Sequence, residues 1–318
     1  MHYLFDIHNL YVYIVSIVYT TYSLTMEVLS LSNTKSRLNS SLKLFPFELP
    51  QYPTNDLFFR TFERVSHSNP DLLPVLNEFA QFDPETFKHS LSVAHVAENA
   101  YCVYAQSHGI EISESSDIFL AGLFHDIGKA GIGKNLKHSN EILYPEKQSG
   151  KIITPAEKKL IGVHDELGGL MLKHIFNESK IPKEAAEKAI LLANSHHGKL
   201  PTSPLSRADK FKLLIFIMSD CAVTMRECRS FSKEARELSI NDLSKFLPFE
   251  LITDANMQVD NNMLNEMMSI VIDFTHSINP ILRQEPAPLP EQFRDGKETT
   301  ILRDATIVAW KELEMRGK

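Results

Sequence analysis

The sequence predicts an all-α protein. From Leu57 onward apolar residues recur with the spacing of an α-helix, and no convincing run shows the period-two alternation of a β-strand. Signals that start and stop helices punctuate the same region. The composition is ordinary for a globular protein, with 43% hydrophobic and 23% charged residues and 12 glycines. The 318 residues are enough to bury a sizeable core.

The first strong helical pattern covers Thr86–Ser107. Ser116–Phe124 is a second, more uniformly apolar helix, and it leads directly into His125. The apolar face that the spacing predicts for the first of these helices consists of Val93, Val96, Ala97, Ala100, Val103 and Tyr104.

The sequence at Thr154, Pro155 and Glu157 predicts the start of a helix. The threonine can cap, the proline suits the first turn, and the glutamate three residues after the threonine completes a capping box. We expect this helix to run through His164 to about His174.

Two more helices follow. Pro182 opens one that ends near His196, where Gly198 and Pro201 are stop signals. Arg207–Glu227 is a long apolar helix. Residues 240–318 predict two or three further helices, and the proline-rich stretch Pro286–Pro290 between them predicts an extended connector.

We predict three regions: an N-terminal extension and linker at residues 1–56, a helical domain at 57–235 and a C-terminal helical region at 236–318. Residues 33–56 have the serine, asparagine and proline content of a linker. Asn9–Met26 carries no formal charge and is long enough to raise a membrane span, but it is rich in Tyr, Thr and Ser and lacks the basic flank of a signal peptide. An added helix or strand, or an extension ahead of a start at Met26, are the alternatives to an anchor. We expect a cytoplasmic protein.

The charge pattern limits the kinds of partner. The net charge is −7 and no basic run is present, which argues against binding of duplex nucleic acid. A phosphate-bearing ligand would therefore need local positive charge from side chains or from metal. The three cysteines, an odd number without paired spacing, predict thiols in a reducing compartment rather than a disulfide framework.

The chemistry-bearing residues are histidines and aspartates at helices and helix ends. His125 and Asp126 place an imidazole and a carboxylate on one turn, a pair that suits a divalent metal accepting nitrogen and oxygen ligands. Asp220 interrupts an apolar run in a predicted helix, where an ionised carboxylate is costly unless a cation or hydrogen bonds compensate it. The other members of the set are His89, His164, His196 and His197.

Each member alone has an ordinary structural explanation. A lone His-Asp pair is most often a helix end with a capping aspartate, and Asp220 by itself could face solvent or cap a kink. Five histidines and two aspartates spread over several helices make the joint coincidence much less probable, so the set predicts a metal site. The remaining histidines fit no ligand spacing, and we expect His95 and His174 on helix surfaces or in satisfied half-buried positions.

Residues 82–228 resemble the HD superfamily of phosphohydrolases and, within it, the HD-GYP subgroup, which implies an HD-domain helical bundle with additional N-terminal and C-terminal segments. The order and spacing of the matching motifs agree with the family pattern throughout. These motifs are Lys88-His89-Ser90, the run His125–Lys129 followed by Gly131-Ile132, Ile142–Lys147, Ile153–Glu157, His164 with Gly168, His196-His197 and Ser219-Asp220.

The resemblance implies a role for each matching residue. One metal ion would be held by His89, His125, Asp126 and Asp220, and Asp126 would bridge to a second ion. The ligands of that second ion would be His164, His196 and His197. With such ligands the expected cofactors are two divalent ions, iron or manganese, with zinc as an alternative.

Two further residues receive roles from the resemblance. Lys129 would contact the substrate phosphate, and with Asp126 it forms the implied catalytic pair. Glu85 lies one helical turn before His89. It would either serve a third metal or be a carboxylate that interacts favourably with the helix N-terminus.

One departure from the subgroup concerns substrate. The Glu and the Gly-Tyr-Pro loop that usually follow the paired histidines are missing, and the sequence instead reads Gly198–Pro204. The expected function is a metal-dependent phosphodiesterase acting on a cyclic dinucleotide such as cyclic di-GMP. The alternatives are an HD phosphohydrolase acting on another nucleotide or phosphoester, and a non-catalytic HD-fold signalling module. A homodimer is a further expectation.

Overall fold

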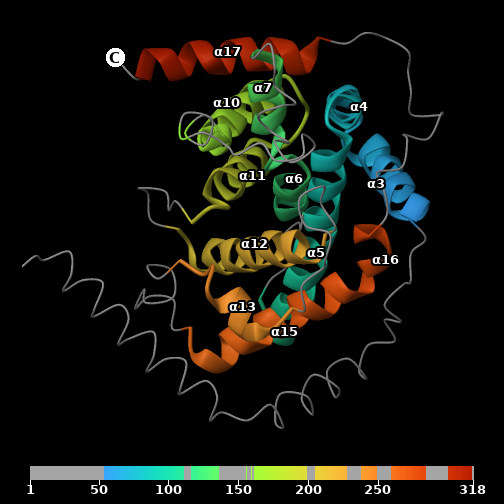
Figure 1. Ribbon diagram of the computed structural model, residues 1–318, viewed down its shortest axis with the longest axis vertical. Coiled ribbons are helices and arrows are strands. Elements are labelled where there is room, and N and C mark those ends of the chain that lie inside the picture. Colours follow the sequence, from blue (N-terminus) through green and yellow to red (C-terminus); the bar gives the residue numbers. More distant parts are fainter. Residues whose placement is uncertain are drawn as a thin grey trace, which may run out of the picture. The chain divides into compact units, whose positions relative to one another are not determined.

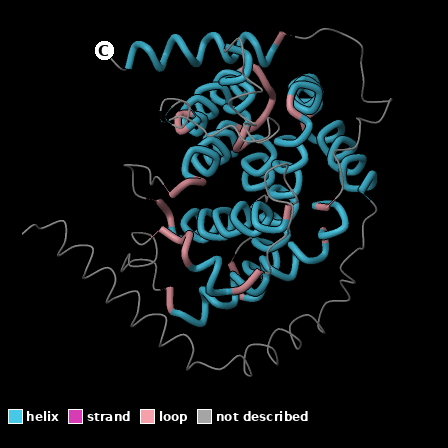
Figure 2. Tube along the Cα trace, viewed as in Figure 1, coloured by secondary structure: helices cyan, strands magenta, loops and turns pink. Residues whose placement is uncertain are grey.

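The computed structural model describes residues 54–110, 116–135, 155, 159, 161–198, 205–227, 238–248, 259–283 and 300–316. Within these ranges the chain consists of helices joined by turns and loops, without a β-strand (Figure 2). The predicted all-α fold is confirmed. None of the helices in these ranges is long and apolar enough to cross a membrane. The predictions for Asn9–Met26 and for the linker up to residue 53 concern residues outside the described part.

The described chain begins with α3 (Thr54–Ser68), a short 3₁₀ helix (Pro70–Leu72) and α4 (Leu73–Phe82). Helix α5 follows at Pro84–Ser107, two residues earlier than the sequence predicted. Its start is set by Asp83, whose side chain accepts a hydrogen bond from the Thr86 amide at 3.1 Å. Pro84 occupies the first turn, where its missing N–H costs no hydrogen bond.

Helix α5 runs through the protein core. It packs against α4, α6 (Ser116–Phe124), α12 (Arg207–Arg226) and α15 (Asn261–Ser277) (Figure 1). The predicted apolar face is buried, except that Val103 is only half-buried. Polar residues on other sides of the helix, such as Ser90 and Ser92, are also fully buried. This helix is therefore enclosed over much of its circumference, which explains its modest amphipathic pattern.

The central part of the chain carries the predicted metal ligands. Helix α6 ends at Phe124, His125 and Asp126 form a two-residue turn, and α7 begins at Ile127 and ends at Asn135. Helix α11 (Lys183–Ser195) follows Pro182 and ends just before His196, as predicted. Helix α12 begins at Arg207 as predicted and ends at Arg226, one residue before the predicted end, and Ser206 caps it by accepting a hydrogen bond from the Asp209 amide.

The predicted helix through His164 is interrupted. Ile161 is helical, Gly162 and Val163 form a turn, and α10 begins at His164 and ends at Asn177. The prediction that His164 lies mid-helix was wrong, because a glycine weakens a helix where the chain can turn instead. Pro155 is helical, but the other two residues of the capping box lie outside the described residues.

Where the sequence predicted two or three helices in the tail, the described part of it holds two long helices and two short ones. The long ones are α15 and α17 (Ile301–Arg316), and the short ones are α13 (Ile240–Ser244) and α16 (Asn279–Leu282). The proline-rich connector lies outside the described residues. Residues 49–318 form one compact unit. The proposed division at residue 235 stays a prediction.

Helix α17 covers α10 and α7, as Figure 1 shows at the end of the molecule where the C-terminus lies. Its first turn is fastened to α4. The Glu78 carboxylate accepts hydrogen bonds from the amides of Ile301 and Leu302 at 3.0 and 2.9 Å. A carboxylate at a helix N-terminus satisfies amides that have no partner within the helix and opposes the positive end of the helix dipole.

Helix α6 approaches α5 unusually closely at Gly122. A Cβ atom added there would lie 2.4 Å from the Cα of Ala94. That distance is shorter than any ordinary contact and involves backbone, which cannot move aside easily. The glycine therefore sets the separation of α5 and α6, and with it the separation of His89 and His125.

The Gly122→Ala variant should lower the free energy of unfolding by roughly 1–3 kcal/mol, the usual cost of overpacking a core. Gly131→Ala is the matched control, because its new Cβ would meet the Met171 sulfur at 2.7 Å, the mobile end of a flexible side chain. A helical alanine also gains about 0.8–1.0 kcal/mol over glycine. Urea denaturation of both variants measures the difference, and equal stabilities would contradict this account of Gly122.

His95 on α5 should make the metal-free protein sensitive to acid. Its pKa falls from 6.5 to about 4, chiefly because of burial; Glu98 opposes this shift, and Arg64 and Arg60 add to it. Between these two pH values the unfolded chain takes up a proton that the folded protein does not, so stability falls as the pH falls from 6.5 to about 4. One such group contributes at most about 1.4 kcal/mol per pH unit.

The variant His95→Gln should therefore lose less stability than the wild type across this window. Denaturation of both metal-free proteins at several pH values gives the two slopes. Parallel curves would show that His95 does not titrate in this way.

Candidate metal centre

The structure brings together seven of the side chains predicted from the sequence. They come from α5, the turn between α6 and α7, the start of α10, the residues after α11 and the middle of α12. All except His197 are buried. The seven residues are His89, His125, Asp126, His164, His196, His197 and Asp220.

One group of three donors consists of His89, His125 and Asp220, whose potential ligand atoms lie within 4.8 Å of one another. The Asp220 Oδ1 atom is 3.0 Å from Nε2 of His89 and 3.8 Å from Nε2 of His125. Two imidazoles and a carboxylate thus face a common point in the interior. We call this group the α5–α12 group.

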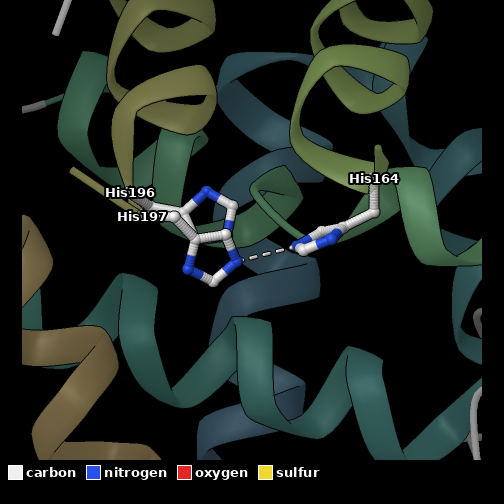
Figure 3. Close-up of side chains that lie close together, drawn as sticks. All are labelled: His164, His196 and His197. Atoms are coloured by element: carbon white, nitrogen blue, oxygen red, sulfur yellow. Dashed lines mark hydrogen bonds between the residues drawn. The ribbon is translucent and has the colours of Figure 1, made fainter. Parts of the chain in front are cut away.

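A second group consists of His164, His196 and His197, again with donor atoms within 4.8 Å. Figure 3 shows His164 approaching from α10, and His196 and His197 from the end of α11. The Nε2 atoms of His164 and His197 are 3.0 Å apart. Two ligands bound at right angles to one ion, each at about 2.1 Å, have about this separation. We call this the trihistidine group.

Asp126 lies between the two groups. Its Oδ1 atom is 3.3 Å from Nε2 of His164 and 3.8 Å from Nε2 of His196. Its Oδ2 atom is 3.5 Å from Nε2 of His125 and 3.8 Å from Nε2 of His89. The two oxygens of one carboxylate therefore face different groups, which is the arrangement that a bridging ligand requires.

Three of the histidines are oriented by the backbone. The Nδ1–H groups of His125, His164 and His196 donate to carbonyl oxygens three residues earlier, at 2.9, 2.7 and 2.5 Å. A carbonyl oxygen can only accept, so Nδ1 carries the proton and Nε2 keeps its lone pair. Such an outer hydrogen bond fixes the tautomer and the ring direction of a metal-ligating histidine.

His89 is oriented differently, by a residue that the sequence did not reveal. Its Nδ1 lies 2.9 Å from Oε2 of Glu227, which is buried at the end of α12. Glu227 follows Asp220 by seven residues, two helical turns, and so falls on the same side of the helix. That spacing is the one signal by which Glu227 could have been found.

Burial and the neighbouring charges set the protonation states. Burial lowers the pKa of His125, and it lowers that of His196 to about 4 with help from His125. Burial alone would raise the pKa of Asp126, but Lys129, His125 and His164 together hold it well below its usual range. Asp220 is likewise kept ionised, against the effect of burial, chiefly by the hydrogen bond with His89. Neutral imidazoles and ionised carboxylates are the forms that bind metal.

The site contains polar atoms that fit a bound cation. The buried Nε2 atoms of His125 and His196 have no hydrogen-bond partner within the described ranges. Leaving a buried polar atom unpaired is costly, and most such atoms in proteins do have a partner. Both atoms face Asp126, and imidazole and carboxylate donors suit a divalent transition metal. The residues present therefore fit the metal ions that the sequence predicted.

Of the last two predicted residues, Glu85 lies outside the two donor groups and Lys129 contacts Asp126. Glu85 is half-buried in the first turn of α5 and is absent from the donor groups formed by the described residues. Lys129, with a side chain 21% exposed, donates to Oδ2 of Asp126 at 2.5 Å. It is a cation at the edge of the site that stays partly open to solvent.

Close contacts at glycines keep the ligand-bearing segments together. A Cβ atom added to Gly128 of α7 would lie 1.9 Å from the His164 carbonyl oxygen. On α10, a Cβ on Gly169 would lie 1.9 Å from the side-chain oxygen of Asn194, two residues before His196. A side chain at Gly128 would push apart the backbones that carry Asp126 and His164, whereas one at Gly169 would displace the Asn194 side chain.

A helical domain that gathers buried histidines and aspartates from separate helices in this way is of the metal-binding class. Residues 86–243 match the model of the HD domain family. This part of the chain therefore belongs to that family, whose members are generally metal-dependent hydrolases, and divalent metal binding comes with it. The match covers all seven converging residues and Lys129 but does not reach Glu85. It does not distinguish the HD-GYP subgroup, which stays a resemblance.

Two other comparisons add no relative. Among curated proteins no match was found. Among solved structures there was likewise none.

Metal binding should stabilise the fold. A ligand that binds only the folded state at 100 times its Kd adds about 2.7 kcal/mol to the free energy of unfolding. Addition of Mn²⁺ to the chelator-treated protein should therefore raise Tm, and the variant His164→Ala should show a smaller rise. Thermal denaturation at several metal concentrations measures this. A Tm that does not respond to Mn²⁺, Fe²⁺ or Zn²⁺ in the wild type would contradict it.

Proposed function

We propose that this protein is a phosphodiesterase that uses two divalent ions, iron or manganese with zinc as an alternative, to hydrolyse a cyclic dinucleotide such as cyclic di-GMP. The observation that supports this most directly is the pairing of two three-donor groups through Asp126. Bound in such a pair, divalent ions supply an activated water and neutralise charge on phosphoryl oxygens.

Side chains of the protein hold the two donor groups together, orient the histidines and bind the substrate phosphate. Asp126 holds the two groups together, and the backbone hydrogen bonds of His125, His164 and His196 keep their Nε2 atoms directed inward. Lys129 provides a cation for a substrate phosphate oxygen, since charge-assisted contacts of this kind are stronger than neutral ones. His197 is the exposed member of the trihistidine group, so a substrate reaches the site from that side.

One observation favours a second candidate substrate. The sequence lacks the Gly-Tyr-Pro loop of the subgroup, and Gly198–Pro204 stands in its place. A hydrolase of another nucleotide or phosphoester would use the same ligands and the same lysine. The two candidates differ in the substrate and not in the centre.

A non-catalytic signalling module is the weaker alternative. Asp126 and Asp220 are only 1% and 9% exposed. Burying two carboxylates close together is costly without compensating cations. A protein that used only the fold would have no physical reason to keep them.

The test is incubation of the full chain with cyclic di-GMP and Mn²⁺ or Fe²⁺, with the products resolved by chromatography. We expect linear dinucleotide or GMP to appear only with metal. The variant Asp126→Ala should lose more than roughly 100-fold in activity. Removal of a residue that only hydrogen-bonds to a metal ligand can already cost that much. Asp71→Ala, which removes an exposed aspartate from the 3₁₀ helix, is the control and should keep full activity.

The outcomes separate the candidates. No product from cyclic di-GMP, despite bound metal, would direct the assay to other nucleotides and phosphoesters. Full turnover by Asp126→Ala would contradict the proposed centre. A wild-type protein that binds no metal and cleaves none of these substrates would favour the signalling module.

A further inference from the structure

We propose that Glu227 is a positioning residue that directs the His89 imidazole toward the metal and strengthens the binding of metal by the α5–α12 group. This inference rests on the proposed function, since it concerns the same centre. Glu227 Oε2 lies 2.9 Å from Nδ1 of His89, and Nε2 of the same ring lies 3.0 Å from Oδ1 of Asp220.

The position of His89 explains why it needs a partner from another helix. His125 and His196 follow the last residues of α6 and α11, and His164 follows a turn, so carbonyl oxygens three residues earlier are available to them. His89 is the sixth residue of α5, where backbone carbonyls are engaged in the helix. Its Nδ1 must find an acceptor elsewhere, and Glu227 supplies one.

The chemistry of the pair favours a cation at Nε2. A carboxylate can only accept, so Nδ1 of His89 donates to Glu227 and the lone pair of a neutral ring lies on Nε2. A metal ion in place of a proton on Nε2 would be held by that lone pair and by the Asp220 carboxylate, whose Oδ1 lies 3.0 Å from Nε2. The negative charge of Glu227 also makes the imidazole a stronger donor, as in other carboxylate–histidine–metal arrangements.

Glu227 is held firmly enough to act in this way. It is 5% exposed, and its amide donates to the Val223 carbonyl at 2.9 Å. Its neighbour Arg226 donates through Nε to the side-chain oxygen of Asn279 at 3.0 Å, at the start of α16.

The histidine is anchored to the same short helix. Lys88, the residue before His89, is buried, and its Nζ donates to the Leu282 carbonyl at the end of α16 at 3.0 Å. Helix α16 thus contacts Arg226, which precedes Glu227, and Lys88, which precedes His89. It thereby fixes the separation of α5 and the end of α12 where Glu227 and His89 meet.

The experiment measures the Mn²⁺ affinity of the chelator-treated full chain by calorimetry, for the wild type and two variants. Glu227→Gln keeps the shape and an acceptor oxygen but removes the charge, and Glu227→Ala removes both. We expect Kd to rise about 10-fold for Glu227→Gln and up to about 100-fold for Glu227→Ala. The Tm of each metal-free protein reports separately on the fold.

Glu266→Gln is the matched control, because Glu266 is also a carboxylate beside a histidine, 3.5 Å from Nε2 of His108, but is half-buried and lies outside the centre. Its Kd should stay within about twofold of the wild type. If Glu227→Ala does not fold, the isosteric Glu227→Gln decides the question alone.

Three results would overturn the inference. The first is an unchanged Kd for folded Glu227→Gln while the wild type binds Mn²⁺; the proposed function would then survive. The second is an equal rise in Kd for Glu266→Gln, which would show a general effect of charge. The third is a wild type that binds no divalent ion, in which case the proposed function fails as well.

Discussion

The burial of Asp126 between two sets of imidazoles is the constraint on which the rest of this structure depends. An ionised carboxylate that is 1% exposed requires compensation, and the nearby cation that supplies it is the Lys129 ammonium group. Burial lowers the pKa of His125 and His196, so their Nε2 atoms face the carboxylate as neutral nitrogens. Such an arrangement is unfavourable by itself and favourable around cations. The fold therefore holds in place a set of side chains whose natural partner is a metal ion.

Close helix packing makes this convergence possible. The converging side chains come from α5, the turn between α6 and α7, α10, the residues after α11, and α12, and the backbones of these segments must approach closely for short side chains to meet. Gly122 and Gly128 stand where two backbones approach each other most closely. The buried ionisable side chains can meet only if their helices approach closely. Glycine, which has no side chain, permits that approach.

Much of the fold could be predicted from local pattern. Helices α5, α11 and α12 follow from apolar spacing and from residues such as Pro182, and Asp220 drew attention because it interrupts an apolar run. Glu227 could not be predicted in the same way, because its partner is 138 residues away and the pairing depends on tertiary packing. The turn at Gly162 was missed because helix periodicity on both sides hides a short break. The role of each ligand came from resemblance and not from spacing.

The contacts that hold the centre extend past the end of the family match, because Lys88 and Arg226 are anchored on α16. The family match ends at residue 243, whereas Asn279 and Leu282 provide the acceptors for these two side chains. A chain shortened at the family boundary would leave a buried lysine without its carbonyl partner, one residue from His89. A chain that keeps these two anchoring hydrogen bonds therefore extends at least through α16.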